Sequence, residues 1–443
     1  MDYQQFDKKH LWHPFTQALN QEDPLCIVKG KGANLFDQDE KAYLDLVSSW
    51  WVTCHGHAHP KIARAIYKQA LELEQVIFAG FTHPPALNLV SKLKKHLPSE
   101  LSRFFFSDNG STAVEVALKM AYQYFFNQNQ KEKTIFLHFQ GGYHGDTYGA
   151  MAVGRTSGFY KPFENFLFKT VSISYPETWD GDQNIEEKEM LALMQLEETL
   201  KTHKGKIVAM ILEPLIQGAS GMKMARASFI KTVCKKLKDE GILVIFDEVM
   251  TAFYRTGSFF AFEEVGIVPD FLCLSKALSG GFLPLSLTVT NETIFEAFKS
   301  EKMIHTFLHG HSFTANPLGC AAAIASLELF ENPKVKQKIK SIEKEHKKGL
   351  EILNKTGLIE KSFAKGTIAR FELKDKNPEL LKQIRIHAEK EGLIIRPLKG
   401  VIYLLPPYII SLVDLKKAYL SLEEIILRSF VKQDSLLTRP LGN

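Results

Sequence analysis

From about residue 60 onward, the chain alternates between segments of helical periodicity and short, continuous apolar runs. Apolar residues recur every three or four positions in 62–77 and in 229–237, which predicts one apolar stripe along each of two helices. Gly241 follows the second stripe at a position suited to ending a helix. The runs at 103–106, 207–212, 242–246 and 271–274 predict strands buried on both faces. Such alternation favours an α/β fold with a mainly parallel central sheet flanked by helices.

The pattern changes near residues 332–333. A long helix is expected there, followed by a half-exposed strand in which Ala369, Phe371 and Leu373 alternate with polar residues. Ser411, with Asp414 three residues later, is close to a capping box and predicts the start of a last helix. We therefore predict a large domain at 56–331 and a smaller α+β domain at 332–443. The N-terminal segment 1–55 is expected to form part of the smaller domain.

The composition is that of an ordinary globular protein, with 45% hydrophobic and 24% charged residues among 443. Lys and Arg number 55 against 50 acidic residues, and a net charge of +5 is too balanced to indicate nucleic acid or a membrane surface as a partner. No apolar run has the length of a membrane-spanning helix, and residues 1–5 lack a secretory pattern. Five scattered cysteines favour reduced thiols, so we expect a cytoplasmic protein.

Two charged residues follow neighbouring buried strands. Asp247 ends the run at 242–246, and Lys276 follows the run at 271–274, 29 residues later (276 − 247). Ligands bind beyond the carboxyl ends of such strands. A buried carboxylate needs a cation, for which a protonated pyridine nitrogen is suited, and a desolvated lysine is nucleophilic toward an aldehyde. The alternatives are that Asp247 caps a helix or pairs with Arg255, and that Lys276 is a surface residue.

Two glycine-containing turns offer further binding groups. Gly110 and Ser111 follow the run at 103–106 and open a helix, whose free N–H groups suit a phosphate. A simple N-cap by Ser111 or Asn109 is the alternative. Tyr143 lies between glycines and is able to lie against a flat heterocycle, or else to pack on the core.

Other common sites find less support in the sequence. His55, His57 and His59 would share one face of an extended segment, but no second ligand group with zinc-finger spacing follows, so we predict no metal site. The glycine patterns of dinucleotide-binding and P-loop proteins do not occur in the sequence.

The ordered set of motifs resembles the class III aminotransferases of fold type I over most of residues 30–410. The matching stretches are 106–111, 142–145, 213–214, 247–249, 255–257 and 274–278. This resemblance implies pyridoxal 5'-phosphate (PLP) as cofactor, held by the large domain. It also implies that Lys276 forms the Schiff base and moves the proton, that Asp247 faces the pyridine nitrogen, and that Gly110 and Ser111 hold the phosphate. Tyr143 would line the cofactor and substrate cavity and act in catalysis.

Three further stretches, 11–17, 48–51 and 395–408, are similar to one branch of that family. That branch transfers an amino group from S-adenosylmethionine to 8-amino-7-oxononanoate in biotin biosynthesis. The resemblance implies a homodimer with shared active sites, in which Gly310, His311 and Ser312 come from the second subunit and the Ser312 hydroxyl reaches the phosphate. It further implies that Phe15, Trp50, Tyr143, Lys276 and Gly310 contact the substrates and that Arg396 pairs with the oxononanoate carboxylate.

The chain departs from this branch at two places. Phe15 stands where the family commonly has Tyr, and the Gly310–His311–Ser312 segment replaces a Gly-Pro-Thr form. Two alternatives therefore stay open: a lysine-using variant of the same step, and another ω-aminotransferase that acts on ornithine, 4-aminobutyrate or a diamine. A non-catalytic protein that retains the fold is a third, which an intact Lys276 and Asp247 disfavour.

Overall fold

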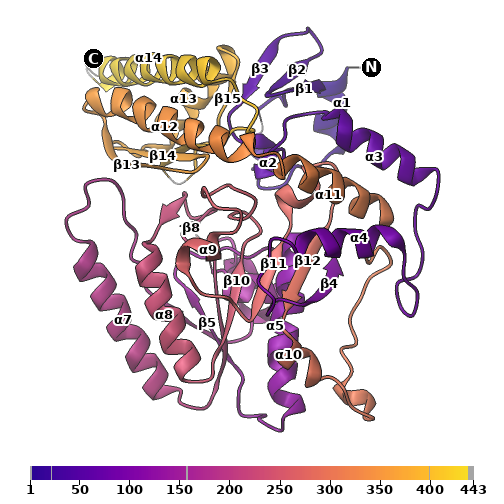
Figure 1. The fold of residues 1–443 in the computed structure, drawn as a ribbon. Coiled ribbons are helices and arrows are strands. Elements are labelled where there is room, and N and C mark those ends of the chain that lie inside the picture. The colour runs from indigo at the N-terminus through magenta and orange to yellow at the C-terminus, as the bar shows by residue number, and fades with distance from the viewer. Residues whose placement is uncertain (1, 21, 156–157, 399, 438–443) are drawn as a thin grey trace.

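The computed structural model describes residues 2–20, 22–155, 158–398 and 400–437, with the backbone alone for 20 and 432–437. A large α/β part lies below a smaller part in Figure 1, and the smaller part contains segments from both ends of the chain. No helix within these described ranges is long and apolar enough to cross a membrane.

A seven-stranded sheet forms the centre of the large part. Parallel pairing joins β11, β10, β7, β5 and β6, whereas β12 runs antiparallel to both of its neighbours, β11 and the edge strand β4. The predicted fold class, a mainly parallel sheet flanked by helices, is therefore confirmed. In spatial order the strands are β4 (Arg103–Ser107), β12 (Ser286–Thr290), β11 (Phe271–Leu274), β10 (Leu243–Asp247), β7 (Ile207–Leu212), β5 (Ile135–Phe139) and β6 (Thr170–Ile173).

Both faces of this sheet are covered by apolar side chains. Along β11, Leu272 and Leu274 join the core that contains α8, whereas Phe271 and Cys273 join the core beneath α5. This two-sided burial explains why the strands appear in the sequence as unbroken apolar runs. The helices of the large part are α3 (Pro60–Ala70), α4 (Pro84–Leu93), α5 (Gly110–Asn127), α6 (Tyr148–Val153), α7 (Ile185–Thr202), α8 (Ala227–Asp239), α9 (Ala261–Val265), α10 (Glu292–Glu296) and α11 (Pro317–Phe330).

The two predicted apolar stripes have different outcomes. Helix α8 ends at Asp239, and Gly241 follows with a φ of 63°, as expected for a residue beyond a helix end. The expectation of one helical stripe from 62 to 77 is wrong, because α3 ends at Ala70. There the Gln69 side-chain amide donates a hydrogen bond to the Leu73 carbonyl and stabilises a turn, and Ile77 is exposed.

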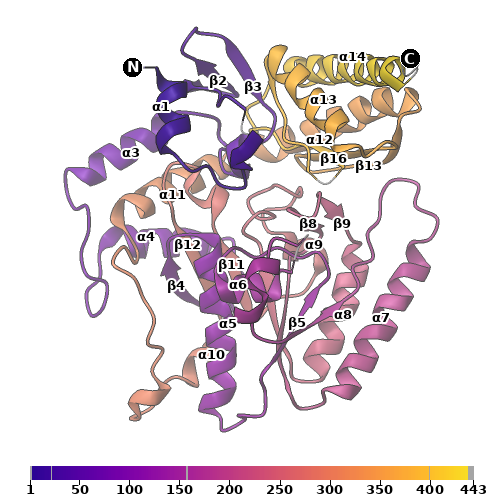
Figure 2. The same ribbon diagram turned by 180° about the vertical axis from the view of Figure 1, so that it is seen from behind.

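The two ends of the chain meet in the smaller part. Strand β15 pairs in parallel with β3, so the N-terminal hairpin and a C-terminal strand share one sheet. Figure 2 shows these N-terminal strands beside the C-terminal helices. The elements are α1 (Tyr3–His10), β1 (Ile27–Lys31), β2 (Asn34–Asp37), β3 (Ala42–Asp45), α2 (Ser48–Trp51), α12 (Lys334–Lys355), β13 (Ile359–Lys365), β14 (Ile368–Leu373), α13 (Pro378–Lys390), β15 (Leu393–Ile394), β16 (Val401–Leu404) and α14 (Leu412–Leu437). A short ribbon, β8 (Ile216–Gln217) with β9 (Lys223–Met224), completes the strands of the large part.

Strand β14 is buried along its whole length, so the expectation of a half-exposed strand is wrong. It lies between β13 and β16, and ion pairs take up its two polar residues. Arg370 pairs with Glu177, which follows β6, at 2.6 Å, and with Glu372 at 2.9 Å. The alternation of apolar and polar residues correctly predicted a strand. It did not predict the burial of the polar face, which depends on ion pairs formed in the tertiary structure.

This ion-pair network generates a stability prediction. Arg370→Leu should lower the free energy of unfolding by about 3 kcal/mol, because Glu177 and Glu372 lose the one buried cation that they share and keep only partly exposed lysines as partners. The matched control is Lys347→Ala, which removes the exposed pair with Glu343 and should cost less than about 0.5 kcal/mol. Urea unfolding followed by fluorescence measures both, and equal small losses would contradict a stabilising role for the network.

Candidate active site

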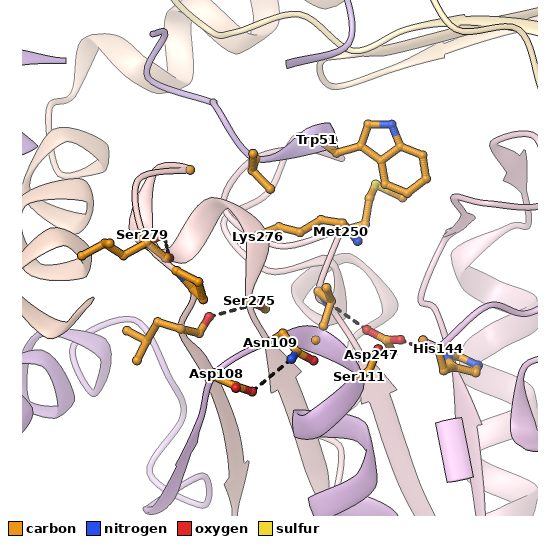
Figure 3. Close-up of a pocket in the computed structure, with 18 of the residues that line it drawn as sticks. Trp51, Asp108, Asn109, Ser111, His144, Asp247, Met250, Ser275, Lys276 and Ser279 are labelled. Atoms are coloured by element: carbon orange, nitrogen blue, oxygen red, sulfur yellow. Dashed lines mark hydrogen bonds and ion pairs between the residues drawn. The ribbon is translucent and has the colours of Figure 1, made fainter. Parts of the chain in front are cut away.

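A cavity of about 440 Å³ opens beyond the carboxyl ends of the central strands (Figure 3). Separate elements supply its polar lining: the residue that ends β10, residues that follow β5, β7 and β11, and the first turn of α5. Five predicted cofactor residues line it: Gly110, Ser111, Tyr143, Asp247 and Lys276. The topology therefore brings together residues that are as far as 166 positions apart (276 − 110) in the chain.

Lys276 is held at the start of a short 3-10 turn, Lys276–Ser279, directly after β11. Its φ of 40° is unusual for an L-residue, and its amine lies 5.0 Å from the centre of the Trp51 ring. Burial lowers the pKa of the Lys276 amine, while the negative charges of Asp247 and Glu213 oppose that shift. The result is an amine that is more readily neutral, and hence more nucleophilic, than an exposed lysine.

Asp247 is buried, with 4% of its surface exposed, and both of its oxygens have partners. One oxygen accepts a hydrogen bond from the Val249 amide at 3.0 Å, and the other lies 2.7 Å from His144 Nδ1. The alternative pairing with Arg255 does not occur, because the Arg255 guanidinium instead donates to the Pro406 carbonyl at 3.0 Å. The partner of Asp247 inside the protein is thus a histidine.

Glu213 is a second buried carboxylate in the cavity lining. It accepts hydrogen bonds from the amides of Tyr143 at 3.2 Å and Gly218 at 2.9 Å, and so fastens two loops together. Burial raises the pKa of Glu213 to about 7. The sequence identified Glu213 as part of a motif, but gave no reason to assign it to the site.

The start of helix α5 has the N-cap that was considered as an alternative, and it also leaves two backbone amides without an intrahelical partner. Asn109 is the N-cap and accepts a hydrogen bond from the Thr112 amide at 3.0 Å, while the amides of Gly110 and Ser111 precede the first intrahelical donor, Ala113. A Cβ at Gly110 would lie 2.8 Å from a Val249 methyl group, which excludes a side chain there. An anion can therefore approach the uncovered turn of this 18-residue helix.

Tyr143 lines the cavity and is fixed at both ends. Its amide donates to Glu213, and its hydroxyl donates to the Asp146 carboxylate at 2.8 Å. Burial and the neighbouring carboxylates raise the pKa of the Tyr143 hydroxyl, so the phenol stays protonated.

A cluster of aromatic side chains lies next to the cavity rather than in its lining. The Phe15 ring centre is 5.7 Å from that of Trp50 and 5.5 Å from that of Phe159, and the Arg396 guanidinium stacks 4.1 Å from Trp50. Trp51, the next residue, does line the cavity. Phe15, Trp50 and Arg396, which the sequence predicts as substrate contacts, thus lie side by side. Sequence reasoning missed Phe159, which stands in a segment without a recognisable motif.

The segment with Gly310, His311 and Ser312 does not line the cavity of its own chain, as far as the described residues show. Gln75 donates a hydrogen bond to the Ser312 carbonyl at 2.9 Å, and the His311 amide donates to Thr314 Oγ1 at 3.2 Å. Gly310 and Ser312 are exposed, between the exposed apolar residues Leu308 and Phe313.

The three histidines of the 55–59 run have three separate structural contacts. His55 Nε2 is 2.9 Å from Ser326 Oγ, His57 Nε2 is 2.8 Å from the Asp45 carboxylate, and His59 accepts from an amide at the start of α3. Among the described residues, no group of three or more His, Cys, Asp or Glu side chains is arranged to hold a metal ion.

The family model described as "Aminotransferase class-III" matches residues 16–426 of this chain. The chain belongs to the class III aminotransferases. Two similar curated relatives are both named adenosylmethionine-8-amino-7-oxononanoate aminotransferase. The protein of Synechococcus elongatus is 49% identical, covering 94% of this chain and 98% of its own, and that of Helicobacter pylori is 37% identical, covering 95% and 96%.

Solved structures of the family agree with this assignment. The adenosylmethionine-8-amino-7-oxononanoate aminotransferase of Methanocaldococcus jannaschii superposes with a TM-score of 0.89 at 32% identity, covering 96% of this chain and 98% of the other. A PLP-bound amine transaminase from an uncultivated Pseudomonas species does so with a TM-score of 0.87 at 29% identity, covering 95% and 99%. Class III aminotransferases depend on PLP, and the predicted cofactor is confirmed for this enzyme.

The environment of Lys276 generates a prediction on reactivity. In the cofactor-free enzyme, reductive methylation of Lys276 should reach half its maximal rate at a lower pH than that of the exposed Lys68. The reason is that burial lowers the pKa of Lys276, and the neutral amine is the reactive form. Peptide mass spectrometry across a pH series measures both sites. A midpoint for Lys276 equal to or above that of Lys68 would contradict this electrostatic description.

Proposed function

We propose that this enzyme transfers an amino group from S-adenosylmethionine to 8-amino-7-oxononanoate and forms 7,8-diaminononanoate, a step of biotin biosynthesis. The observation that carries the proposal is the Arg396 guanidinium, stacked 4.1 Å from Trp50 beside the cavity. A long, mostly apolar keto acid needs an aromatic wall and one fixed cation for its carboxylate. An Arg–carboxylate hydrogen bond contributes about 1.5–3 kcal/mol. The names of the similar relatives support the same reaction.

The lining residues fit PLP by charge and by shape. The first turn of α5, with Gly110 and the Ser111 hydroxyl, would hold the phosphate, and the partner's Ser312 would add a second hydroxyl. Asp247 would face the pyridine nitrogen and keep it protonated, since an anion within hydrogen-bond distance favours the charged form. When bound, PLP supplies the aldehyde that takes up the amino group and the electron sink that stabilises a carbanion.

The side chain that moves the proton is Lys276. Its amine is neutral more readily than an ordinary lysine, so it can take a proton from the amine-bearing carbon of the donor. Positioned proton transfer of this kind contributes about 10²–10⁴-fold to a rate. The Tyr143 hydroxyl remains protonated and held by Asp146, which keeps the ring in place along the cavity.

Donor and acceptor occupy one cavity in turn, although they differ in charge. Aromatic rings suit both, because a sulfonium is attracted to a ring face and an alkyl chain packs against it. Phe15 keeps this aromatic face and lacks the family's hydroxyl, so weaker donor binding is expected rather than a different donor. Lysine as donor would need an anion for its distal amine, and the nearby Asp146 already accepts a hydrogen bond from Tyr143.

We further propose that the enzyme is a cytoplasmic homodimer whose subunits share their active sites. Exposed Gly310 and Ser312 lie between exposed apolar side chains, as expected for a segment that a second subunit covers. The five cysteines are free thiols, which suits a reducing compartment.

The donor is tested by its half-reaction. S-adenosylmethionine alone should abolish the visible absorbance band of the PLP-loaded enzyme, and subsequent 8-amino-7-oxononanoate should restore it. Lysine should leave the band unchanged. Lys276→Ala, which lacks the proton-transfer group, is the control and should show neither change.

Arg396→Gln separates the acceptor from the donor in this assay. The variant should bleach with the donor at nearly the normal rate, and its KM for 8-amino-7-oxononanoate should rise about 10–100-fold through loss of the charged pair. Bleaching by lysine but not by S-adenosylmethionine would assign the donor to lysine, and a normal acceptor KM in Arg396→Gln would remove the proposed role of Arg396.

Shared sites are tested by subunit mixing. Lys276→Ala and Ser312→Trp should each be inactive alone, the second because a bulky residue blocks the partner's phosphate site. A mixed dimer should contain one working site, which combines Lys276 from one subunit with Ser312 from the other. Activity regained after unfolding and refolding the two together measures this, whereas an active monomer in sedimentation would refute it.

A further inference from the structure

We propose that Asp45 and His57 are positioning residues that hold the tryptophan loop, residues 46–52, and thereby set substrate affinity. The inference rests on the proposed function for the identity of the substrate, but its structural part does not. It also gives a role to His57, the middle residue of the histidine run, which takes no part in the catalytic chemistry.

The tryptophan loop has a strained backbone. Ser48, Ser49 and Trp51 have φ values of 50°, 60° and 67°, in the left-handed region that residues other than glycine rarely adopt. A left-handed conformation costs free energy at each of these residues. It persists only where contacts with the surrounding structure stabilise it. Contacts that hold this loop must therefore exist, and their loss should release it.

Asp45 provides the closest of these contacts. Its side chain is fully buried at the end of β3, where one oxygen accepts a hydrogen bond from the Val47 amide at 3.0 Å. The other oxygen accepts from the Ser49 amide at 2.7 Å and lies 2.8 Å from His57 Nε2. A single carboxylate thus binds two amides of the strained loop and one imidazole.

His57 is in turn fixed by the N-terminal hairpin. Its amide donates a hydrogen bond to the Gly32 carbonyl at 2.8 Å, and its Cβ occupies the space where a side chain at Gly30 would lie, 2.6 Å from a Cβ there. The hairpin therefore determines where His57 lies, and His57 limits how Asp45 can move.

The tryptophan loop connects this pair to both parts of the site. Trp50 supports the Arg396 guanidinium at 4.1 Å, and Trp51 lies 5.0 Å from the Lys276 amine and donates a hydrogen bond to the Tyr403 hydroxyl at 3.2 Å. Ser48 Oγ also donates to the Leu405 carbonyl at 2.7 Å, so the loop has a second attachment. Removing the Asp45 charge should loosen the loop without unfolding the protein.

Asp45→Asn tests this directly. The asparagine side chain keeps the shape of the aspartate, but its NH₂ group replaces one accepting oxygen and then faces a backbone N–H, which is itself a donor. In the PLP-loaded enzyme, hydrogen exchange of a peptide covering 46–52 should be about tenfold faster or more. The KM for 8-amino-7-oxononanoate should rise about tenfold with kcat nearly unchanged. His57→Ala, which keeps Asp45 and both of its amide contacts, should cause a smaller change of the same kind. His59→Asn, in the same histidine run and still able to cap α3, should leave both quantities unchanged.

Two results would overturn the proposal: unchanged exchange of 46–52 in a folded Asp45→Asn enzyme, or equal effects of His57→Ala and His59→Asn. If Asp45→Asn does not fold, His57→Ala decides alone, through the exchange rate of 46–52. An enzyme that rejects 8-amino-7-oxononanoate in its unmodified form contradicts the proposed function, whereas the exchange result still decides whether Asp45 and His57 hold the loop.

Discussion

The site depends on one buried charge, the Asp247 carboxylate at the end of β10. A carboxylate in such a place is costly unless cations or hydrogen-bond donors surround it. His144 Nδ1 at 2.7 Å and the Val249 amide at 3.0 Å satisfy part of that requirement from within the protein. The negative charge that these two partners do not neutralise makes this end of the sheet suited to a cationic heterocycle. Binding such a heterocycle is the role that we propose for Asp247. The position of Asp247 follows from a fully buried strand that leaves its last residue at the cavity.

The smaller part of the molecule contributes by bringing the two ends of the chain to this cavity. Pairing of β15 with β3 sets the segment that contains Arg396 beside the loop that contains Trp50. Because β15 has only two residues, this arrangement needs additional support, and the Leu405 amide provides it by donating a hydrogen bond to the Leu46 carbonyl at 2.6 Å. The aromatic and cationic groups beside the cavity therefore depend on contacts between residues about 350 positions apart.

Sequence reasoning succeeded where a local signal and the global fold agreed. The strand at 271–274 has the predicted bounds, and the residues ending two adjacent strands, Asp247 and Lys276, reach one cavity. It failed where tertiary contacts decide. The polar face of β14 is buried by ion pairs that include a distant loop, and α3 ends at Ala70, where the Gln69 side chain hydrogen-bonds to the backbone of the following turn. His144 lay in the matched stretch 142–145 without an assigned role, and Phe159 gave no signal, since the partners of both are fixed only by the fold. The roles of the individual site residues stay predictions.

The two buried carboxylates of the cavity, Asp247 and Glu213, differ in the groups that stabilise their negative charge. This difference affects the pKa of Lys276. Asp247 lies against an imidazole, whereas Glu213 has backbone amides as partners, and burial raises its pKa to about 7. Glu213 therefore takes up a proton at a higher pH than an exposed glutamate does. Its negative charge is one of the two that favour the protonated form of Lys276. When Glu213 takes up a proton, that support weakens and the Lys276 amine becomes neutral more readily. Protonation of Glu213 thus favours the neutral Lys276 amine, the form that the proposed proton transfer by Lys276 requires.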